Sequence, residues 1–348
     1  MTEPVAHLAG TARSLPAPPL SLADGPLFGL PLPELWFGLL FFIFAVFLVL
    51  DGFDFGVGAL FATREDPHER EQLIAAIGPF WDGNEVWLVV FGGAMFAAFP
   101  SVYAALFSRH YLLMFAILGA LILRGLAPEL YEQREDDAWK RWWGRAFVVG
   151  SVTAPFFLGV FAANWVLGAT RIVTVPGVVV GLAVVALTVV DGAAFLRLKT
   201  RGGLQTDLER AGLRALVAYV GLVVLALGTI YATTPAVRSA LTSPLALGLV
   251  VATVALAGGY AVAMRRDRHL AAFATAAGLV FALVGVVARL TYPYVDRATG
   301  RTVGDAIVST LPLNLMTIGA AVLLPLVFGY FVVLYSTFSG PVEAGETY

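Results

Sequence analysis

Apolar runs of about twenty residues recur from one end of the sequence to the other, separated by short polar connections. A helix of roughly 20 apolar residues spans the hydrocarbon core of a bilayer. The short alternating segments of membrane barrel strands do not dominate. The pattern therefore predicts an all-α, polytopic membrane helical bundle with about nine transmembrane helices. The expected helices are residues 33–61, 77–99, 107–127, 146–167, 175–196, 211–232, 244–264, 270–292 and 311–337.

The two ends of the chain differ from this apolar middle. Residues 1–32 are rich in Pro, Ala, Ser and Leu and lack the basic start and apolar core of a signal peptide. We expect them to form an irregular N-terminal extension. Residues 33–337 are then one transmembrane domain, and residues 338–348 are a short C-terminal tail.

Basic residues in the connections indicate the orientation, because cytoplasmic loops carry an excess of Lys and Arg. The connections that follow the first, third, fifth and seventh expected helices are the richer set, with residues such as Arg64, Lys140, Arg201 and Arg266. This set belongs in the cytoplasm. With an odd number of helices, the N-terminus is then outside and the C-terminus is cytoplasmic.

Composition supports the membrane class and limits the cofactor chemistry. The chain is 59% hydrophobic and 13% charged, whereas soluble domains have about 25% charged residues. It has no cysteine, which excludes a disulfide, a thiolate metal site and a covalently attached c-type haem. We expect membrane lipid, and no nucleic acid, among its partners.

Two acidic strings fall inside the first two expected helices. DGFDFGVG begins at Asp51, near the end of the first helix, and WDGNE begins at Trp81, near the start of the second. An ionisable side chain at membrane depth is costly, and function is its usual explanation. These strings are therefore the first candidates for a functional site.

Helix direction places several ionisable side chains at one depth. At 1.5 Å per residue, both acidic strings lie roughly 7–16 Å into the inner half of the membrane. The side chains that share this depth are Asp51, Asp54, Asp82, Glu85, Arg124 and Asp191. A single acid fits a structural pair with Arg124 equally well, but several acids at one depth favour a hydrated polar channel, because proton relays through membranes are built from such groups.

Histidine placement argues against a haem bound by this chain. The four histidines lie in the extension, in a charged loop or near helix ends, at His7, His68, His110 and His269. An axial pair across helices needs histidines inside the helices. We therefore expect no cofactor and no metal bound by the chain's own ligands.

The acidic strings, extended to LDGFDFGVGALF and IGPFWDGNEVWLVVFGGAMFAAFPSVYAALFS, closely resemble subunit II of the cytochrome bd-type quinol oxidases. The resemblance continues in LILRGLAPEL, which contains Arg124 and Glu129, and in SVTAPFFLGVFAAN. It covers about residues 33–337. The two N-terminal strings are highly specific to this family.

The resemblance implies a respiratory function. Subunit II pairs with a homologous subunit I, which carries haems b and d and the quinol site. The complex oxidises quinol, reduces dioxygen to water and takes up protons from the cytoplasm, in a bacterial-type cytoplasmic membrane. Subunit II supports assembly of the haem-bearing subunit. A small single-helix accessory subunit and a structural quinone are further candidates for partners.

The resemblance also implies site residues, none of them in the direct chemical step. Asp51 and Asp82 match the family's acids in DGFD and WDGN, and we expect both to face one water-filled path open to the cytoplasm. The predicted proton pathway consists of Asp51, Asp54, Asp82, Glu85 and Asp191. The predicted supporting residues are Trp81, Asn84, Arg124 and Glu129. The chain departs from the family at Asp191, where relatives commonly have histidine.

Two other functions remain open from the residues alone. One is a proton-coupled secondary transporter with a buried carboxylate site. Many transporters have broken helices and a site near the membrane midplane, whereas here the first two helices are continuous and the acids lie off-centre. The other is a structural scaffold in which the acids only pair with Arg124.

Overall fold

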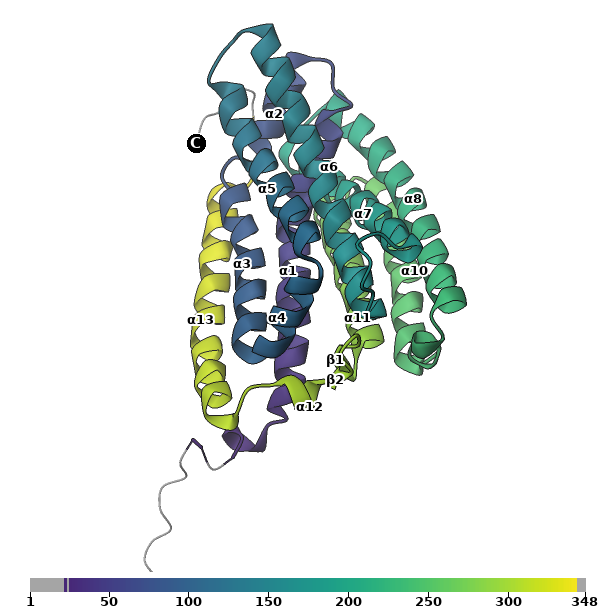
Figure 1. The fold of residues 1–348 in the computed structure, drawn as a ribbon. Coiled ribbons are helices and arrows are strands. Elements are labelled where there is room, and N and C mark those ends of the chain that lie inside the picture. Colours follow the sequence, from purple (N-terminus) through teal and green to yellow (C-terminus); the bar gives the residue numbers. More distant parts are fainter. Residues whose placement is uncertain (1–21, 24, 343–348) are drawn as a thin grey trace, which may run out of the picture.

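The computed structural model describes residues 22, 23 and 25–342, which form a helical bundle with one short hairpin (Figure 1). Eight helices in this part of the chain are long and apolar enough to cross a membrane: α1 (Leu32–Phe61), α5 (Tyr111–Glu132), α6 (Asp137–Leu167), α7 (Val175–Lys199), α8 (Gly203–Thr233), α10 (Pro244–Arg265), α11 (His269–Thr291) and α13 (Thr310–Thr337). The shorter elements are η1 (Leu27–Gly29), α2 (Pro67–Ile77), α3 (Trp81–Ala98), α4 (Pro100–Arg109), η2 (Pro235–Val237), α9 (Arg238–Leu241), β1 (Tyr294–Asp296), β2 (Arg301–Thr302) and α12 (Val303–Ala306). The predicted N-terminal extension lies mostly outside the described residues.

The predicted all-α membrane class is confirmed. The second expected helix differs from the other long helices because polar residues lower its hydropathy. That helix, expected at 77–99, is α3, which has 18 residues and lacks the 18-residue apolar stretch that each of the eight long helices contains. It carries Asp82, Asn84 and Glu85 in its first turns. It still runs along the bundle beside α1 and α13 (Figure 1). The count of nine spans and the sidedness of the termini stay predictions.

Several helices are longer than the apolar pattern predicted. α6 begins at Asp137, not at residue 146, and α8 begins at Gly203, not at residue 211. The side chain of Asp136 accepts a hydrogen bond of 2.9 Å from the backbone N–H of Trp139, which caps the first turn of α6. Hydropathy detects only the apolar part of a helix, and polar residues extend these two helices beyond it.

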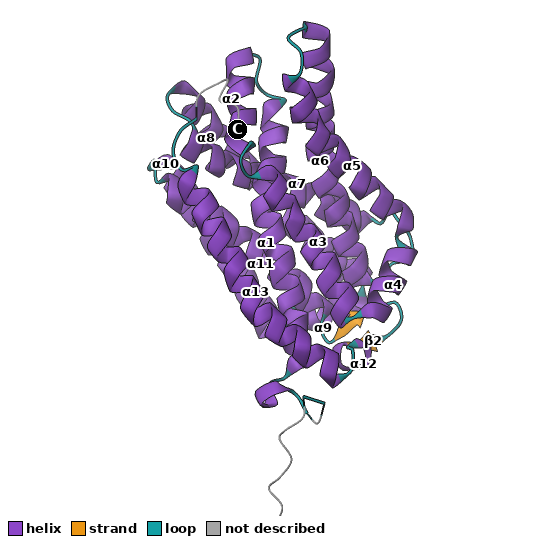
Figure 2. Ribbon diagram, turned by 90° about the vertical axis from the view of Figure 1, so that its left-hand side faces the viewer, coloured by secondary structure: helices purple, strands orange, loops and turns teal. Residues whose placement is uncertain are grey.

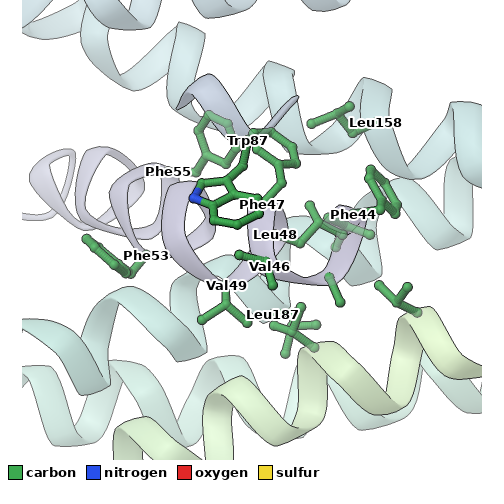
Figure 3. Close-up of a cluster of buried hydrophobic side chains, with 14 of the residues drawn as sticks. Phe44, Val46, Phe47, Leu48, Val49, Phe53, Phe55, Trp87, Leu158 and Leu187 are labelled. Atoms are coloured by element: carbon green, nitrogen blue, oxygen red, sulfur yellow. The ribbon is translucent and has the colours of Figure 1, made fainter. Parts of the chain in front are cut away.

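The centre of the bundle is α1, which packs against α3, α6, α7 and α11 and buries most of its residues. Figure 3 shows side chains from four helices meeting around it: Phe44 and Phe47 of α1, Trp87 of α3, Leu158 of α6 and Leu187 of α7. All five are at least nine-tenths buried. A helix that is apolar on every side belongs in the middle of a bundle, and this position surrounds Asp51 and Asp54 with protein.

Glycines allow α1 and α7 to touch backbone to backbone. A Cβ atom on Gly56 of α1 would collide with the carbonyl oxygen of Thr188 on α7. A Cβ atom on Gly192 of α7 would lie 2.7 Å from the Cα atom of Gly56. Small residues serve this purpose in membrane bundles because lipid supplies no hydrophobic force between helices.

The last helix, α13, is joined to the bundle largely through aromatic side chains. Trp87 of α3 contacts Phe328 and Phe331, with ring centroids 5.3 Å and 5.8 Å away. Phe80, just before α3, stacks on Tyr335 at 4.5 Å. The C-terminal part of α13 therefore lies beside the N-terminal half of α3.

The structure gathers the basic connections at one end of the bundle. The connections α1–α2, α5–α6, α7–α8 and α10–α11 lie at the upper end in Figure 1. The β hairpin, α9 and α12 lie at the opposite end, as Figure 2 shows with the strands in orange. The grouping of loops used to predict the orientation agrees with this arrangement.

The hairpin end is held by a buried ion pair. The carboxylate of Asp296 accepts hydrogen bonds of 3.0 Å and 2.9 Å from the two terminal nitrogens of Arg109. It also accepts from the hydroxyl of Thr299 at 2.8 Å. Burial alone would raise the pKa of Asp296, but the bonds from Arg109 and Thr299 outweigh it and hold that pKa below its usual range.

We predict that Gly56→Ala destabilises the protein, whereas Gly38→Ala does not. Both glycines lie in α1, but a Cβ atom on Gly38 would contact nothing within 4 Å. Replacing Gly by Ala inside a helix gains about 1 kcal/mol of propensity. Overpacking costs about 1–3 kcal/mol or more, and at Gly56 the obstacle is backbone that cannot turn aside. The thermal unfolding midpoint in detergent measures the difference; equal midpoints for the two variants would contradict the close α1–α7 contact.

We predict that Asp296→Asn lowers stability at neutral pH by about 1.5–3 kcal/mol, the usual contribution of hydrogen bonds to a charged group. Because the pKa of Asp296 is lowered on folding, its stabilisation is fully present above the unfolded value of about 3.9 and is lost as the pH falls through the folded value. The gap between wild type and variant should be constant from pH 5 to 8 and narrow below about pH 4. A gap that widens in acid would reverse the assigned sign. Glu65→Gln, at an exposed carboxyl, is the control.

Candidate functional site

Arg124 of α5 lies among three carboxylates from two other helices. Its Nη2 atom pairs with Asp51 of α1 and lies 3.5 Å from an oxygen of Asp54. Its Nη1 atom lies 3.3 Å from the carboxylate of Glu85 on α3. Asp51, Asp54 and Arg124 are buried, whereas the Glu85 side chain is 31% exposed. We call these four residues the arginine–carboxylate cluster.

Local helix geometry and flanking rings assemble the cluster. Asp51 and Asp54 are one turn apart and share a face of α1. The guanidinium of Arg124 lies against Phe55 and Trp81, with its central carbon 5.1 Å and 5.6 Å from their ring centroids. Aromatic faces attract a cation in a dry environment. These contacts hold the guanidinium in place together with its ion pairs.

Close packing of α5 on α6 covers the cluster from behind. A Cβ atom on Gly150 of α6 would lie 2.6 Å from the backbone nitrogen of Arg124 and 2.8 Å from the carbonyl oxygen of Ala120. Only a glycine lets α6 approach this part of α5. The cluster is therefore enclosed by protein on the α6 side and is not in contact with lipid there.

Asn84, predicted as a supporting residue, connects the cluster to α13. Its side chain is fully buried. The amide nitrogen donates to an oxygen of Asp54 at 2.9 Å and to the carbonyl oxygen of Leu50 at 3.1 Å. The amide oxygen accepts from the hydroxyl of Tyr335 at 2.9 Å. The site therefore includes a residue near the C-terminal end of α13, about 250 positions away in sequence.

Asp191 of α7 approaches the cluster without bonding to it. It is fully buried, and a Cβ atom on Gly52 of α1 would lie 3.5 Å from one of its oxygens. Neither oxygen has a hydrogen-bond partner among the described residues. One oxygen each of Asp51 and Asp54 also lacks a partner there. Three neighbouring acids thus keep hydrogen-bonding capacity in the bundle interior.

Two predicted site residues lie on the surface of the bundle. Asp82 is exposed on α3, and Glu129 is exposed on α5. Asp51 is fully buried, whereas Asp82 is exposed, so the two side chains do not lie side by side. A water-filled path shared by both acids stays a prediction. At 3.6 residues per turn, Asp82 is about 200° around the helix from Asn84, which faces α1. Shared depth was visible in the sequence, but rotation about the helix axis was not.

Tyr335 is the residue that sequence reasoning missed. Tyrosines near the ends of membrane helices are common at the interface with water, so its position gave no signal of its own. The available clue in the sequence was Asn84. An amide side chain at membrane depth needs hydrogen-bond partners, so a further residue had to bond to it.

The described residues include no group of three or more His, Cys, Asp or Glu that could hold a metal ion. Their histidines lie at helix ends, with His110 between α4 and α5 and His269 at the start of α11.

An apolar cavity of about 100 Å³ lies among α6, α7, α8, α10 and α11. It is lined by Tyr219, whose buried hydroxyl has no partner among the described residues.

Fold and site together define a polytopic helical membrane protein with a carboxylate cluster in its interior. The family described as cytochrome bd terminal oxidase subunit II matches residues 32–338. The chain therefore belongs to the cytochrome bd oxidase subunit II family. It is a subunit of a respiratory quinol oxidase and a multi-pass protein of the bacterial inner membrane. This confirms the resemblance noted in its two acidic strings.

Individual relatives agree with the family. The chain is 34% identical over 338 residues to cytochrome bd ubiquinol oxidase subunit 2 of Bacillus subtilis (strain 168), covering 90% of this chain and 98% of the relative. It is 33% identical over 215 residues to cytochrome bd-I ubiquinol oxidase subunit 2 of Escherichia coli (strain K12), covering 57% and 56%. The bd oxidase structure from Geobacillus thermodenitrificans has a similar fold, with a TM-score of 0.74 and 17% identity over 89% of this chain and 99% of that chain.

We predict that Arg124→Met strongly reduces the amount of folded protein. It would leave buried carboxylates without a cation, and breaking a buried ion pair in this way costs about 3–5 kcal/mol. Adding Asp51→Asn should recover part of the loss, because it removes the charge that pairs most closely with Arg124. Detergent-soluble protein that survives heating is the measurement. Arg210→Met, at an exposed arginine, is the control, and an Arg124→Met protein as stable as this control would contradict the assignment.

Proposed function

We propose that this chain is the non-haem subunit of its quinol oxidase, that it supports assembly of the haem-bearing subunit I, and that it lines a proton-uptake path from the cytoplasm. The observation that carries this proposal is the arginine–carboxylate cluster at membrane depth. Family membership supplies the reaction, and the cluster supplies what this chain contributes to it. A proton-coupled transporter is disfavoured by that membership.

Charge balance supports a role for the cluster in holding protons. One guanidinium faces three carboxylates, and Asp191 is a fourth acid close to α1. Burying several uncompensated negative charges is costly. The cluster is most easily accommodated when its acids share protons, and a group of acids that shares protons is suited to passing them on.

The exposed acids point to the side from which the partner binds. Asp82, Val86 and Val89 are exposed and recur at helical spacing on α3. Leu118, Ile122, Leu126 and Glu129 form a similar stripe on α5. An ionisable group at membrane depth faces protein or water, and not lipid. We assign this face to contact with subunit I.

The two sets of acids are joined through Glu85. It contacts Arg124 on one side and is partly exposed on the other. It also lies one turn from Asp82 on α3, so the two side chains are neighbours on the helix surface. The proposed path runs from the buried acids Asp51 and Asp54 through Glu85 to Asp82 at the partner surface.

The cofactors of the complex belong to the partner in this proposal. The described residues offer no axial histidine inside a membrane helix, so their chemistry does not fit a haem. We assign haems b and d, with quinol oxidation and dioxygen reduction, to subunit I. Among the described residues, the apolar cavity of about 100 Å³ beside Tyr219 is our candidate site for the ring of a structural quinone, because an apolar cavity of similar size can hold a single ring. A single-helix accessory subunit remains a further candidate partner.

The test compares Asp51→Asn and Asp82→Asn in the purified complex with subunit I. Asparagine keeps the size and hydrogen bonding of aspartate but cannot exchange a proton in the same way. We predict that both variants slow quinol-driven oxygen consumption by about tenfold or more, because proton transfer by a placed side chain contributes at least this much. Haem content should stay near that of the wild type.

The control is Asp137→Asn, at an exposed acid in the first turn of α6, which should leave the rate unchanged. Two results would reject the relay. One is an unchanged rate in a fully assembled Asp82→Asn or Asp51→Asn complex. The other is a loss of activity that only follows the loss of haem, which would assign the acids to assembly alone.

A further inference from the structure

A chain of hydrogen bonds joins the C-terminal part of α13 to a buried acid of α1. The hydroxyl of Tyr335 donates to the amide oxygen of Asn84 at 2.9 Å. The amide nitrogen of Asn84 donates to an oxygen of Asp54 at 2.9 Å. Three helices, α13, α3 and α1, are therefore connected through two side-chain bonds that end on a carboxyl of the arginine–carboxylate cluster.

The orientation of the Asn84 amide follows from its partners. The carbonyl oxygen of Leu50 accepts hydrogen bonds and cannot donate, so the amide atom 3.1 Å from it is the nitrogen. The oxygen of the amide then faces Tyr335, whose hydroxyl is able to donate. With both ends fixed, the second N–H of the amide is directed at Asp54.

Tyr335 itself is held in place by neighbours on both sides. Its ring stacks on Phe80 at 4.5 Å, with 21° between the ring planes, and meets Phe53 edge-on at 6.3 Å. Beyond α13, the backbone of Val342 donates to the carbonyl of Lys199 at 2.9 Å and accepts from Gln72 at 2.8 Å. The ring of Tyr335 is therefore positioned by α1 and the turn before α3, while α2 and α7 hold the segment that follows α13.

We propose that Tyr335 is a positioning residue for proton uptake, which fixes Asn84 so that Asp54 always meets a hydrogen-bond donor. This inference rests on the proposed function of the cluster. Without the hydroxyl, the buried oxygen of Asn84 loses its donor, and the amide is held only by its bonds to Leu50 and Asp54. An amide held at one end only donates to Asp54 in a less fixed geometry, which changes how that carboxyl takes up and releases a proton.

The test is Tyr335→Phe in the purified complex with subunit I, supplied with a short-chain quinol and followed with an oxygen electrode. Phenylalanine keeps the stack on Phe80 and removes only the hydroxyl. We expect the rate per haem to fall about three- to tenfold, as for the loss of one buried hydrogen bond, and the pH profile of the rate to change. Tyr330→Phe, at an exposed tyrosine of the same helix, is the matched control and should behave as the wild type.

A double-mutant cycle separates positioning from anchoring of α13. If Tyr335 acts through Asn84, Tyr335→Phe should have no further effect on the rate per haem in an Asn84→Ala complex. If Tyr335 only anchors the helix, the two losses should multiply and the pH profile of the single variant should match that of the wild type. That second pattern would overturn the inference.

Asp54→Asn distinguishes this inference from the function on which it rests. A normal rate in an assembled Asp54→Asn complex would overturn the proposed relay and, with it, the role of Tyr335. A slow Asp54→Asn complex beside a Tyr335→Phe complex with wild-type rate and pH profile would leave the relay standing and reject positioning by Tyr335. Slow rates in both, with a changed pH profile in Tyr335→Phe, support the two together.

Discussion

The ion pairs of Arg124 are the constraint on which the interior of this protein depends. One guanidinium joins α5 to Asp51 and Asp54 of α1 and to Glu85 of α3. Charges in a membrane interior are accommodated only when they are paired and enclosed. The positions of α1, α3 and α5 are therefore not independent, and the same interaction that makes the buried acids tolerable also holds them close together.

Close helix contacts are the second requirement, because a polar cluster needs walls. Glycines supply them where α1 meets α7, at Gly56 and Gly192, and where α5 meets α6, at Gly150. At each site a single added carbon atom would meet backbone. The acids can be buried near the axis of the bundle because backbones approach closely enough to exclude lipid.

The cluster is connected in two directions, and the connections differ in kind. Towards the exposed faces of α3 and α5, Glu85 and Asp82 place ionisable groups at the surface of the bundle. Towards α13, Asn84 and Tyr335 offer neutral hydrogen bonds that fix geometry. A site arranged in this way pairs groups that can carry a proton with groups that can only orient one.

The sequence by itself determined the membrane class, the position of nearly every helix and the depth of the acids, because hydropathy, loop charge and the rise per residue are local properties. It also indicated the family through the strings at Asp51 and Trp81. Rotation about each helix axis, and contact between distant segments, depend on packing between helices. Only the tertiary structure could therefore decide that Asp82 faces outward while Asn84 faces α1. It alone showed that Asp191 stands apart from the ion pairs, and that Tyr335 of the last long helix reaches a site formed by the first half of the chain.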